Sequence, residues 1–245
     1  MCKKIKVEYF FISFFFTAEE YDGVTSYLPT TAGYAVLIAL MVAILLIACY
    51  CNGKKSVKLS SKQLAFSAMA MALAVVTSMI KLFELPMGGS VTLFSMLFIV
   101  LIGYWFGLKA GLMTAIAYGF LQLILEPYII HPMQMMVDYI FAFGALGLSG
   151  IFANKKHGLL IGYWVAVFGR FVFAFMSGMI FFGSAAADYN MSIPVYSAVY
   201  NGSYLLAEGL MTTIIICIPP LNKALAKVKN MALSGRKVFT ISLPR

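Results

Sequence analysis

Seven long apolar segments, separated by short polar ones, occupy most of this 245-residue chain. Only 11% of the residues are charged, and the apolar runs are continuous, without regular alternation with polar residues. A bilayer is crossed by helices of about 20 mainly apolar residues, whereas the strands of a membrane barrel alternate in polarity. The sequence therefore predicts an all-α integral membrane protein. The segments lie at 34–50, 63–82, 91–108, 110–126, 133–152, 158–182 and 197–219.

The chain is predicted to have three parts. Residues 1–57 form an N-terminal extension, which holds an extra transmembrane helix and a basic linker and begins like a signal peptide without a cleavage site. Residues 58–221 form a membrane domain of six helices. Residues 222–245 form a basic tail.

Most of the 18 Lys and Arg residues fall on one predicted side of the membrane, in the linker, in two later loops and in the tail. The net charge of +9 therefore indicates orientation rather than a nucleic-acid partner. By the positive-inside rule this side is cytoplasmic, although the basic start of the chain argues against an outside N-terminus. We expect a multi-pass protein of the cell membrane with a cytoplasmic C-terminus.

Polar residues gather toward the opposite side. Gln134 and Asp138 are four residues apart and share a helix face, as do Tyr196 and Tyr200, with Asn201 beside them. A charged side chain at membrane depth is a candidate for function by default. A carboxylate among aromatic rings suits a flat cationic ligand.

Ordinary structural roles compete with these assignments. Asn201 could join two helices by hydrogen bonds, and His131 before Pro132 could cap a helix. Arg170 could pair with Asp138 or extend toward the interface. An aromatic belt at the membrane surface could explain Tyr128, Tyr139 and Tyr196.

The motifs of the common enzyme classes are absent from the sequence. It has no P-loop, no H-E-x-x-H and no G-x-S-x-G, and the only histidines are His131 and His157. The four cysteines lack metal-site spacing. We therefore expect a protein that is not an enzyme and that needs no cofactor or metal.

Several sequence blocks, in order over about residues 60–225, resemble the thiamine-specific S-component (ThiT family) of energy-coupling factor (ECF) transporters. The blocks are GGSVTLFSM (88–96), YGFLQLILEPYIIHPMQMMVDY (118–139), AFGALGLSG (142–150), RFVFAFMSGMIFFGS (170–184) and YSAVYNGSYLLAE (196–208). The resemblance implies a six-helix S-component bundle around a cavity near the outer face. It also implies that the chain binds thiamine, has no ATPase of its own and docks on a membrane T-component with two ATPase subunits.

The resemblance also implies a set of binding residues. Asp138 would meet the aminopyrimidine, with Tyr139 beside it, and Phe182 would stack on the ligand. Asn201 and Tyr196 match the polar residues of the last helix. The loop and helix that line the pocket supply Tyr128 and Gln134, and His131 of the same loop is included as a candidate.

Two positions depart from the family pattern. Ala174 stands where many members have histidine, and Gly89 where some have tryptophan. An S-component for a different vitamin therefore stays open. A proton-coupled secondary transporter using Asp138 and Glu208 is a further alternative, although the sequence lacks visible internal repeats. An intramembrane enzyme is the least favoured alternative, because the sequence has no catalytic constellation.

The first helix of the six-helix domain carries small residues at helical spacing. In this superfamily such residues contact the T-component, so Ala68 and Ala72 are expected to form the docking face. Ala70 and Ala74 offer a second register. Packing inside the bundle is the competing explanation.

Overall fold

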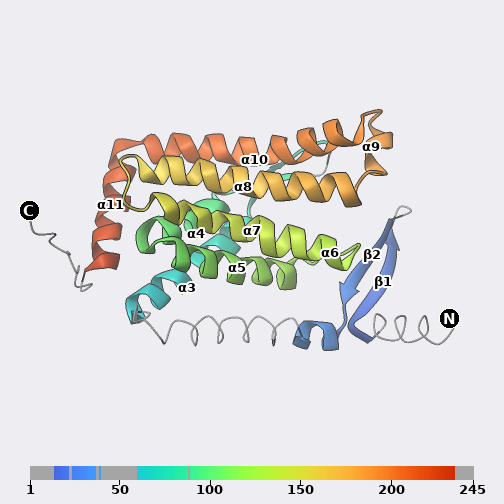
Figure 1. Ribbon diagram of the computed structural model, residues 1–245, viewed down its shortest axis with the longest axis horizontal. Helices are drawn as coiled ribbons and strands as arrows, with labels where there is room; N and C mark the ends of the chain where they lie inside the picture. Colours follow the sequence, from blue (N-terminus) through green and yellow to red (C-terminus); the bar gives the residue numbers. More distant parts are fainter. Residues whose placement is uncertain (1–13, 22–23, 37–38, 40–59, 88, 235–245) are drawn as a thin grey trace, which may run out of the picture.

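The computed structural model describes residues 14–21, 24–36, 39, 60–87 and 89–234, and helices dominate it (Figure 1). The labelled helices are α3 (Ser61–Ser78), α4 (Ser95–Phe106), α5 (Leu108–Leu125), α6 (Pro132–Met135), α7 (Ala142–Gly144), α8 (Gly158–Phe181), α9 (Ala185–Asp188), α10 (Ile193–Cys217) and α11 (Pro219–Leu233), and residues 31–36 are helical as well. A π-helical turn, η2 (Met136–Phe141), and a 3-10 helix, η3 (Ala145–Phe152), continue α6 and α7. The strands are β1 (Phe16–Tyr21), β2 (Val24–Pro29), β3 (Lys81–Glu84) and β4 (Ser90–Thr92).

Each apolar segment predicted after residue 60 contains a helix, so the helical interpretation is confirmed. Within the described ranges, three helical segments are long and apolar enough to cross a membrane, namely Leu108–Leu125, Pro132–Phe152 and Gly158–Phe181. A fourth is obtained if α10 and α11, which meet at 85°, count as one broken span. With 12 residues, α4 is shorter than a full span.

Two predicted helical segments extend too far. The C-terminal end of 63–82 and the N-terminal end of 91–108 belong to β3 and β4, which pair as an antiparallel hairpin. Proline and glycine in the intervening PMGG end the helical run. Leu85 donates its backbone N–H to the carbonyl of Gly89 at 2.7 Å and closes the hairpin. This hairpin contributes residues to the cavity described below.

The bundle packs closely around η3, which contacts α4, α5 and α8. Small residues make this possible: a Cβ atom at Gly111 would lie 2.7 Å from the Cα of Gly103. Leu146, Ile99 and Tyr163 are fully buried beside these contacts. Close backbone approach through small residues is the usual packing of membrane helices.

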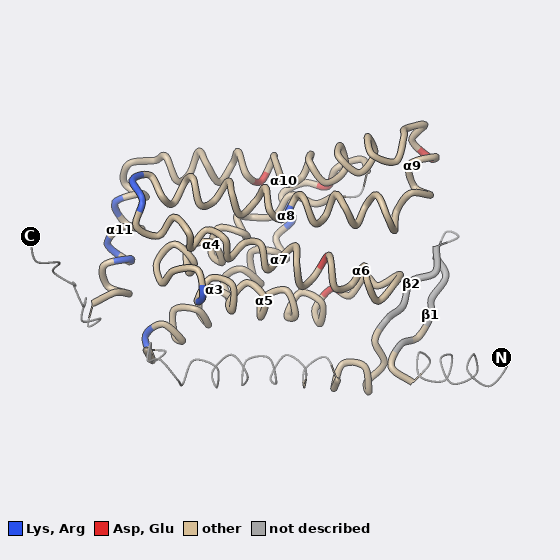
Figure 2. Tube along the Cα trace, viewed as in Figure 1, with Lys and Arg blue, Asp and Glu red and all other residues tan. Residues whose placement is uncertain are grey.

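Helix α11 crosses one end of the bundle (Figure 1). Leu225, Val228 and Ala232 pack against the core, while Lys223 and Lys227 face outward. Basic residues gather at this end, whereas acidic residues lie from the middle of the bundle toward α6 and α9 (Figure 2). Part of the predicted basic tail is therefore a helix attached to the bundle.

The N-terminal extension is described only in part. Strands β1 and β2 form an antiparallel hairpin, with Phe16 paired to Pro29. The Asp-Gly pair that separates the two strands in the sequence is a common hairpin signal, but no strand was predicted at this position. The predicted helix over 34–50 lies mostly outside the described residues, and the three-part division of the chain stays a prediction.

Candidate ligand-binding site

A cavity of about 540 Å³ opens among α3, α5, α8, α10, the β3–β4 hairpin and the segment from α6 to α7. Its lining includes residues of α6 and α9, two elements that lie at the end of the bundle opposite α11 (Figure 1). Ligand pockets typically have volumes of about 300–1,000 Å³. Seven of the eight predicted binding residues line it, namely Tyr128, Gln134, Asp138, Tyr139, Phe182, Tyr196 and Asn201.

The π-helical turn η2 carries Asp138 and Tyr139 at the cavity wall. Such turns are rare and often occur at functional sites. Gly119 of α5 lies against the backbone carbonyl of Tyr139, and a Cβ atom at this position would collide with that oxygen. The glycine therefore lets the widened turn approach α5, which fixes where Asp138 projects.

Gln134 and Tyr139 hold the neighbouring loop in place. The amide of Gln134 donates to Asp138 Oδ2 at 2.7 Å and to the carbonyl of Tyr128 at 3.1 Å, and it accepts from Ile130 N at 3.2 Å. The Tyr139 hydroxyl donates to the carbonyl of Glu126 at 2.8 Å and accepts from Tyr128 N at 2.9 Å. Both side chains line the cavity, and their polar atoms already orient Asp138 and the loop at 126–130.

Aromatic rings form two parts of the wall. Tyr128 stacks on Phe182 with centroids 6.0 Å apart, and Tyr196 stacks on Tyr200 at 5.9 Å. Burial raises the pKa of Tyr128, which lies in the loop between two helices, so its hydroxyl stays protonated at neutral pH. Ring faces of this kind attract cations.

Asn201 combines a cavity position with a structural role. Its Nδ2 donates to the carbonyl of Ala174 on α8 at 3.2 Å, and its Oδ1 accepts from the Tyr204 hydroxyl at 3.0 Å. The predicted helix-to-helix contact is therefore present. Because Oδ1 has a second lone pair, the side chain can still accept a hydrogen bond from a ligand.

Arg170 does not form an ion pair with Asp138, which was one of its two predicted roles. Its guanidinium lies over the ring of Phe143, 4.2 Å from the centroid, and it lines the cavity. In the part of the chain that the structure describes, the only ion pair within 4.0 Å joins Lys81 and Glu84.

The cavity wall carries an excess of negative charge. Three acidic residues line it, Glu126, Asp138 and Glu208, against two basic ones, Lys81 and Arg170. Lys81 also pairs with Glu84 at 3.3 Å, outside the lining. With formal charges on all five lining groups, one monovalent cation would neutralise the wall.

Sequence reasoning did not select several residues that line the cavity, among them Ser177, Glu208 and Gln122. The hydroxyl of Ser177 is buried beside the carboxyl group of Asp138 and makes no hydrogen bond of regular geometry to a described residue. A buried polar group without a partner is costly, so this hydroxyl is a candidate contact for a ligand. The sequence had singled out Glu208, a carboxylate inside an apolar helix, only as a proton-coupling residue of the alternative secondary transporter and not as a binding residue.

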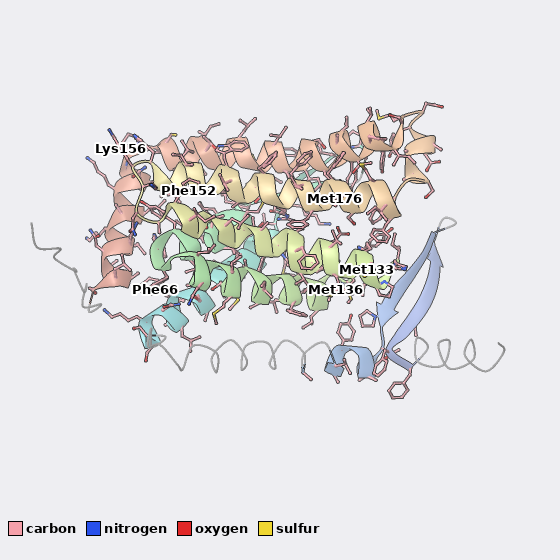
Figure 3. The ribbon with its side chains drawn as sticks, viewed as in Figure 1. Phe66, Met133, Met136, Phe152, Lys156 and Met176 are labelled. Carbon is pink, nitrogen blue, oxygen red and sulfur yellow. The ribbon has the colours of Figure 1, made fainter. Side chains whose placement is uncertain are left out.

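His131 does not line the cavity. Its Nδ1 accepts from Met133 N at 3.1 Å at the start of α6, and its ring stacks on Phe181 at 5.3 Å. This geometry supports the alternative role as a helix cap. Met133 and Met136 lie at the outer surface of the same region (Figure 3).

The two departures from the family pattern have different surroundings. Ala174 lines the cavity, where a larger side chain would reduce its volume. At Gly89 a Cβ atom would lie 2.7 Å from the ring of Tyr204. The tyrosine therefore occupies the space that a side chain at position 89 would need.

The predicted docking residues Ala68 and Ala72 are exposed on α3, whereas Ala70 and Ala74 are buried at 7% and 0% exposure. Leu64, Met69 and Leu73 extend the same exposed apolar face. Of the two possible registers, only the Ala68–Ala72 register is free for a partner.

Comparisons with known proteins agree on one family. The model of the thiamine transporter protein family matches residues 64–228. The thiamine transporter ThiT of Bacillus subtilis (strain 168) is 34% identical over 166 residues, which cover 62% of this chain and 84% of the relative. The thiamine transporter ThiT of Lacticaseibacillus paracasei is 25% identical over 127 residues, or 45% of this chain and 63% of the relative. A solved structure of ThiT from Listeria monocytogenes superposes with a TM-score of 0.59 at 25% identity, covering 68% of this chain and 96% of that one.

Proposed function

Because the chain belongs to the thiamine transporter protein family, we propose that it binds thiamine from outside the cell and delivers it to an ECF module. It is a multi-pass membrane protein, and the role of its family is transport. The observation that carries the proposal is the cavity itself. It is lined by aromatic rings and carries one excess negative charge, which matches a ligand with an aminopyrimidine and a fixed thiazolium cation.

In the proposed binding mode, Asp138 accepts a hydrogen bond from the amino group of the pyrimidine. A hydrogen bond to an ionised acceptor is about twice as strong as a neutral one. The stacked pairs Tyr128–Phe182 and Tyr196–Tyr200 would flank the rings, and Asn201 would offer Oδ1. Gln134 and Tyr139 would act mainly by orienting Asp138 and the loop.

The energy for uptake would come from other subunits. The sequence has no P-loop, and the exposed small residues of α3 give a membrane T-component room for close helix contact. In this proposal the T-component and two ATPase subunits complete the importer. The basic end of the bundle, with α11, would face the cytoplasm.

The purified chain is expected to bind thiamine with one site per protein and to move none across a bilayer by itself. Calorimetric titration measures the first result and uptake into proteoliposomes the second. Uptake by this chain alone, driven by a proton gradient, would refute the proposal and favour the secondary transporter. Uptake should appear when the T-component and ATPases are reconstituted with it and ATP is supplied.

A different vitamin is the second candidate, because Ala174 and Gly89 change the surface and the surroundings of the cavity. Mass spectrometry of the small molecule that co-purifies with the protein separates the two. Thiamine in that fraction supports the proposal, and another vitamin in its place would overturn the ligand assignment.

Replacing Ser177 by alanine is expected to weaken thiamine binding by about 0.5–1.5 kcal/mol while leaving the melting temperature nearly unchanged. The hydroxyl lies beside the carboxyl group of Asp138 and makes no hydrogen bond that ties two elements of the ligand-free fold together in the described residues, so its removal acts on the binding site rather than on the stability of the bundle. Ser197→Ala is the matched control, since that hydroxyl donates to the carbonyl of Phe175 at 2.8 Å. The control should lower the melting temperature. A Ser177→Ala variant with unchanged affinity would remove this residue from the site.

A further inference from the structure

Glu208 is one of three carboxylates in the cavity wall and is separate from Asp138 and Glu126 in the sequence. It lies on α10, seven residues and so two helical turns beyond Asn201 on the same face. Its side chain is only 3% exposed, and the residue lines the cavity. Burying an unpaired charge costs free energy, so a carboxylate as buried as Glu208 needs compensating interactions or a function.

The surroundings of Glu208 consist of donors. Thr92 Oγ1 donates to Oε2 at 2.7 Å, and Ser95 Oγ and the backbone N–H of Met96 donate to Oε1, each at 3.3 Å. Ser95 and Met96 form the first turn of α4, where the helix dipole favours a negative charge. Glu208 acts only as an acceptor in these contacts, which is the hydrogen-bonding pattern of a carboxylate.

Glu208 has no cationic partner within 4.0 Å in the described part of the chain, where the single ion pair joins Lys81 and Glu84. Arg170 also lines the cavity, but its guanidinium lies over the ring of Phe143. The protein therefore surrounds a buried negative charge with hydrogen-bond donors and, in the part of the chain described, places no cationic group within 4.0 Å of it. A ligand that enters the cavity with a permanent positive charge can supply one.

We propose that Glu208 provides the counter-charge for the fixed positive charge of the ligand, so that it selects a cationic ring over an uncharged ring of the same shape. The inference rests on the proposed function and assigns a different part of the ligand to each of two carboxylates. Asp138 recognises the amino group of the pyrimidine, and Glu208 stabilises the thiazolium. Coulomb attraction in a poorly solvated cavity acts over several ångströms, so the two groups need no direct contact.

Anchoring the hairpin is the competing role for Glu208. Its contact with Thr92 ties β4 to α10, and loss of that tie would loosen the cavity wall for any ligand. The two roles predict different results with a pair of ligands that differ only in charge. Thiamine and an analogue in which carbon replaces the thiazolium nitrogen form such a pair.

The test measures the affinity of both ligands by calorimetric titration on the full chain in lipid nanodiscs. The wild-type protein is expected to bind thiamine at least about 10-fold more tightly than the uncharged analogue. Glu208→Gln should lower the thiamine affinity by about 10-fold and change the analogue affinity by less than about 2-fold. Thr92→Val loosens the hairpin but keeps the charge, so it should weaken both ligands by the same factor. Asp138→Asn should also weaken both alike, because both carry the amino group.

Several outcomes would overturn the inference. A ratio of affinities that stays unchanged in Glu208→Gln would leave Glu208 with the anchoring role alone. If Glu208→Gln does not fold, the wild type and Asp138→Asn still test the inference. A wild-type ratio of thiamine affinity to analogue affinity near one would show that the fixed charge of the ligand is not recognised. A ratio that falls to about one in Asp138→Asn would assign the counter-charge to Asp138. These results refute only the inference, whereas a wild-type protein that binds neither ligand would refute the proposed function as well.

Discussion

Asp138→Asn is expected to weaken thiamine binding by about 1.5–3 kcal/mol, or roughly 10- to 150-fold in affinity. The substitution keeps the size of the side chain and removes its charge. The hydrogen bond that the amino group of the ligand donates would then meet a neutral acceptor or a repelling amide group. Titration of the purified variant by calorimetry or by intrinsic fluorescence gives the affinity directly.

The matched control for this variant is Asp188→Asn, which makes the same chemical change at an exposed position of α9 outside the cavity lining. Its affinity should equal that of the wild type. The melting temperature of the ligand-free protein should also be similar in all three proteins, because Gln134 can donate to the side-chain carbonyl of the variant as it does to the carboxylate of Asp138. Unchanged affinity in Asp138→Asn would return this residue to a structural role.

The helical core of the molecule was predictable because a bilayer imposes a simple rule. Backbone polar groups must be satisfied within the segment that crosses the membrane, so continuous apolar runs become helices. Residues 110–126 and 158–182 illustrate this, since α5 and α8 follow them to within two residues. The polar cluster around Asp138 followed from the cost of charge at membrane depth.

The local geometry of the site could not be predicted from such patterns. The π-helical turn that carries Asp138 and Tyr139 depends on a contact between the Tyr139 carbonyl and Gly119, two residues of different helices. Neither hydrophobic periodicity nor local propensity records a contact of this kind. The same holds for Gln134, whose role as an orienting residue follows from three hydrogen bonds and not from its spacing to Asp138.

The hairpin of β3 and β4 and the helix α11 show another limit. The strands have four and three residues, too few for a reliable alternation of polar and apolar positions. In α11 the apolar positions Leu225, Val228 and Ala232 do follow helical spacing, but the surrounding lysines made the segment resemble a solvated tail. Its packing against the bundle depends on tertiary contacts such as Lys229 Nζ to the carbonyl of Ala153 at 2.8 Å.

The largest effect on transport is expected from Ala68→Trp combined with Ala72→Trp. Both alanines are exposed and four residues apart on α3, so the two indole rings would cover one helix face. In the proposed complex they would hold the helix of the T-component several ångströms away, where dispersion attraction is lost. Vitamin uptake by the reconstituted importer should therefore fall to background, as measured with radiolabelled thiamine.

Thiamine binding by the same double variant in isolation should stay within about 2-fold of the wild type, because neither alanine lines the cavity. Leu210→Trp serves as the control for a bulky ring on the membrane-facing surface, since Leu210 is 57% exposed on α10, and it should leave both binding and uptake intact. Ala74→Trp is the opposite control: Ala74 is fully buried, so the ring should overpack the bundle and reduce folding, binding and uptake together. Uptake that persists with tryptophan at both 68 and 72 would place the docking surface elsewhere. Loss of binding in that variant would instead show that these alanines belong to the packing of the bundle, because only a separate docking face allows the two activities to be lost independently.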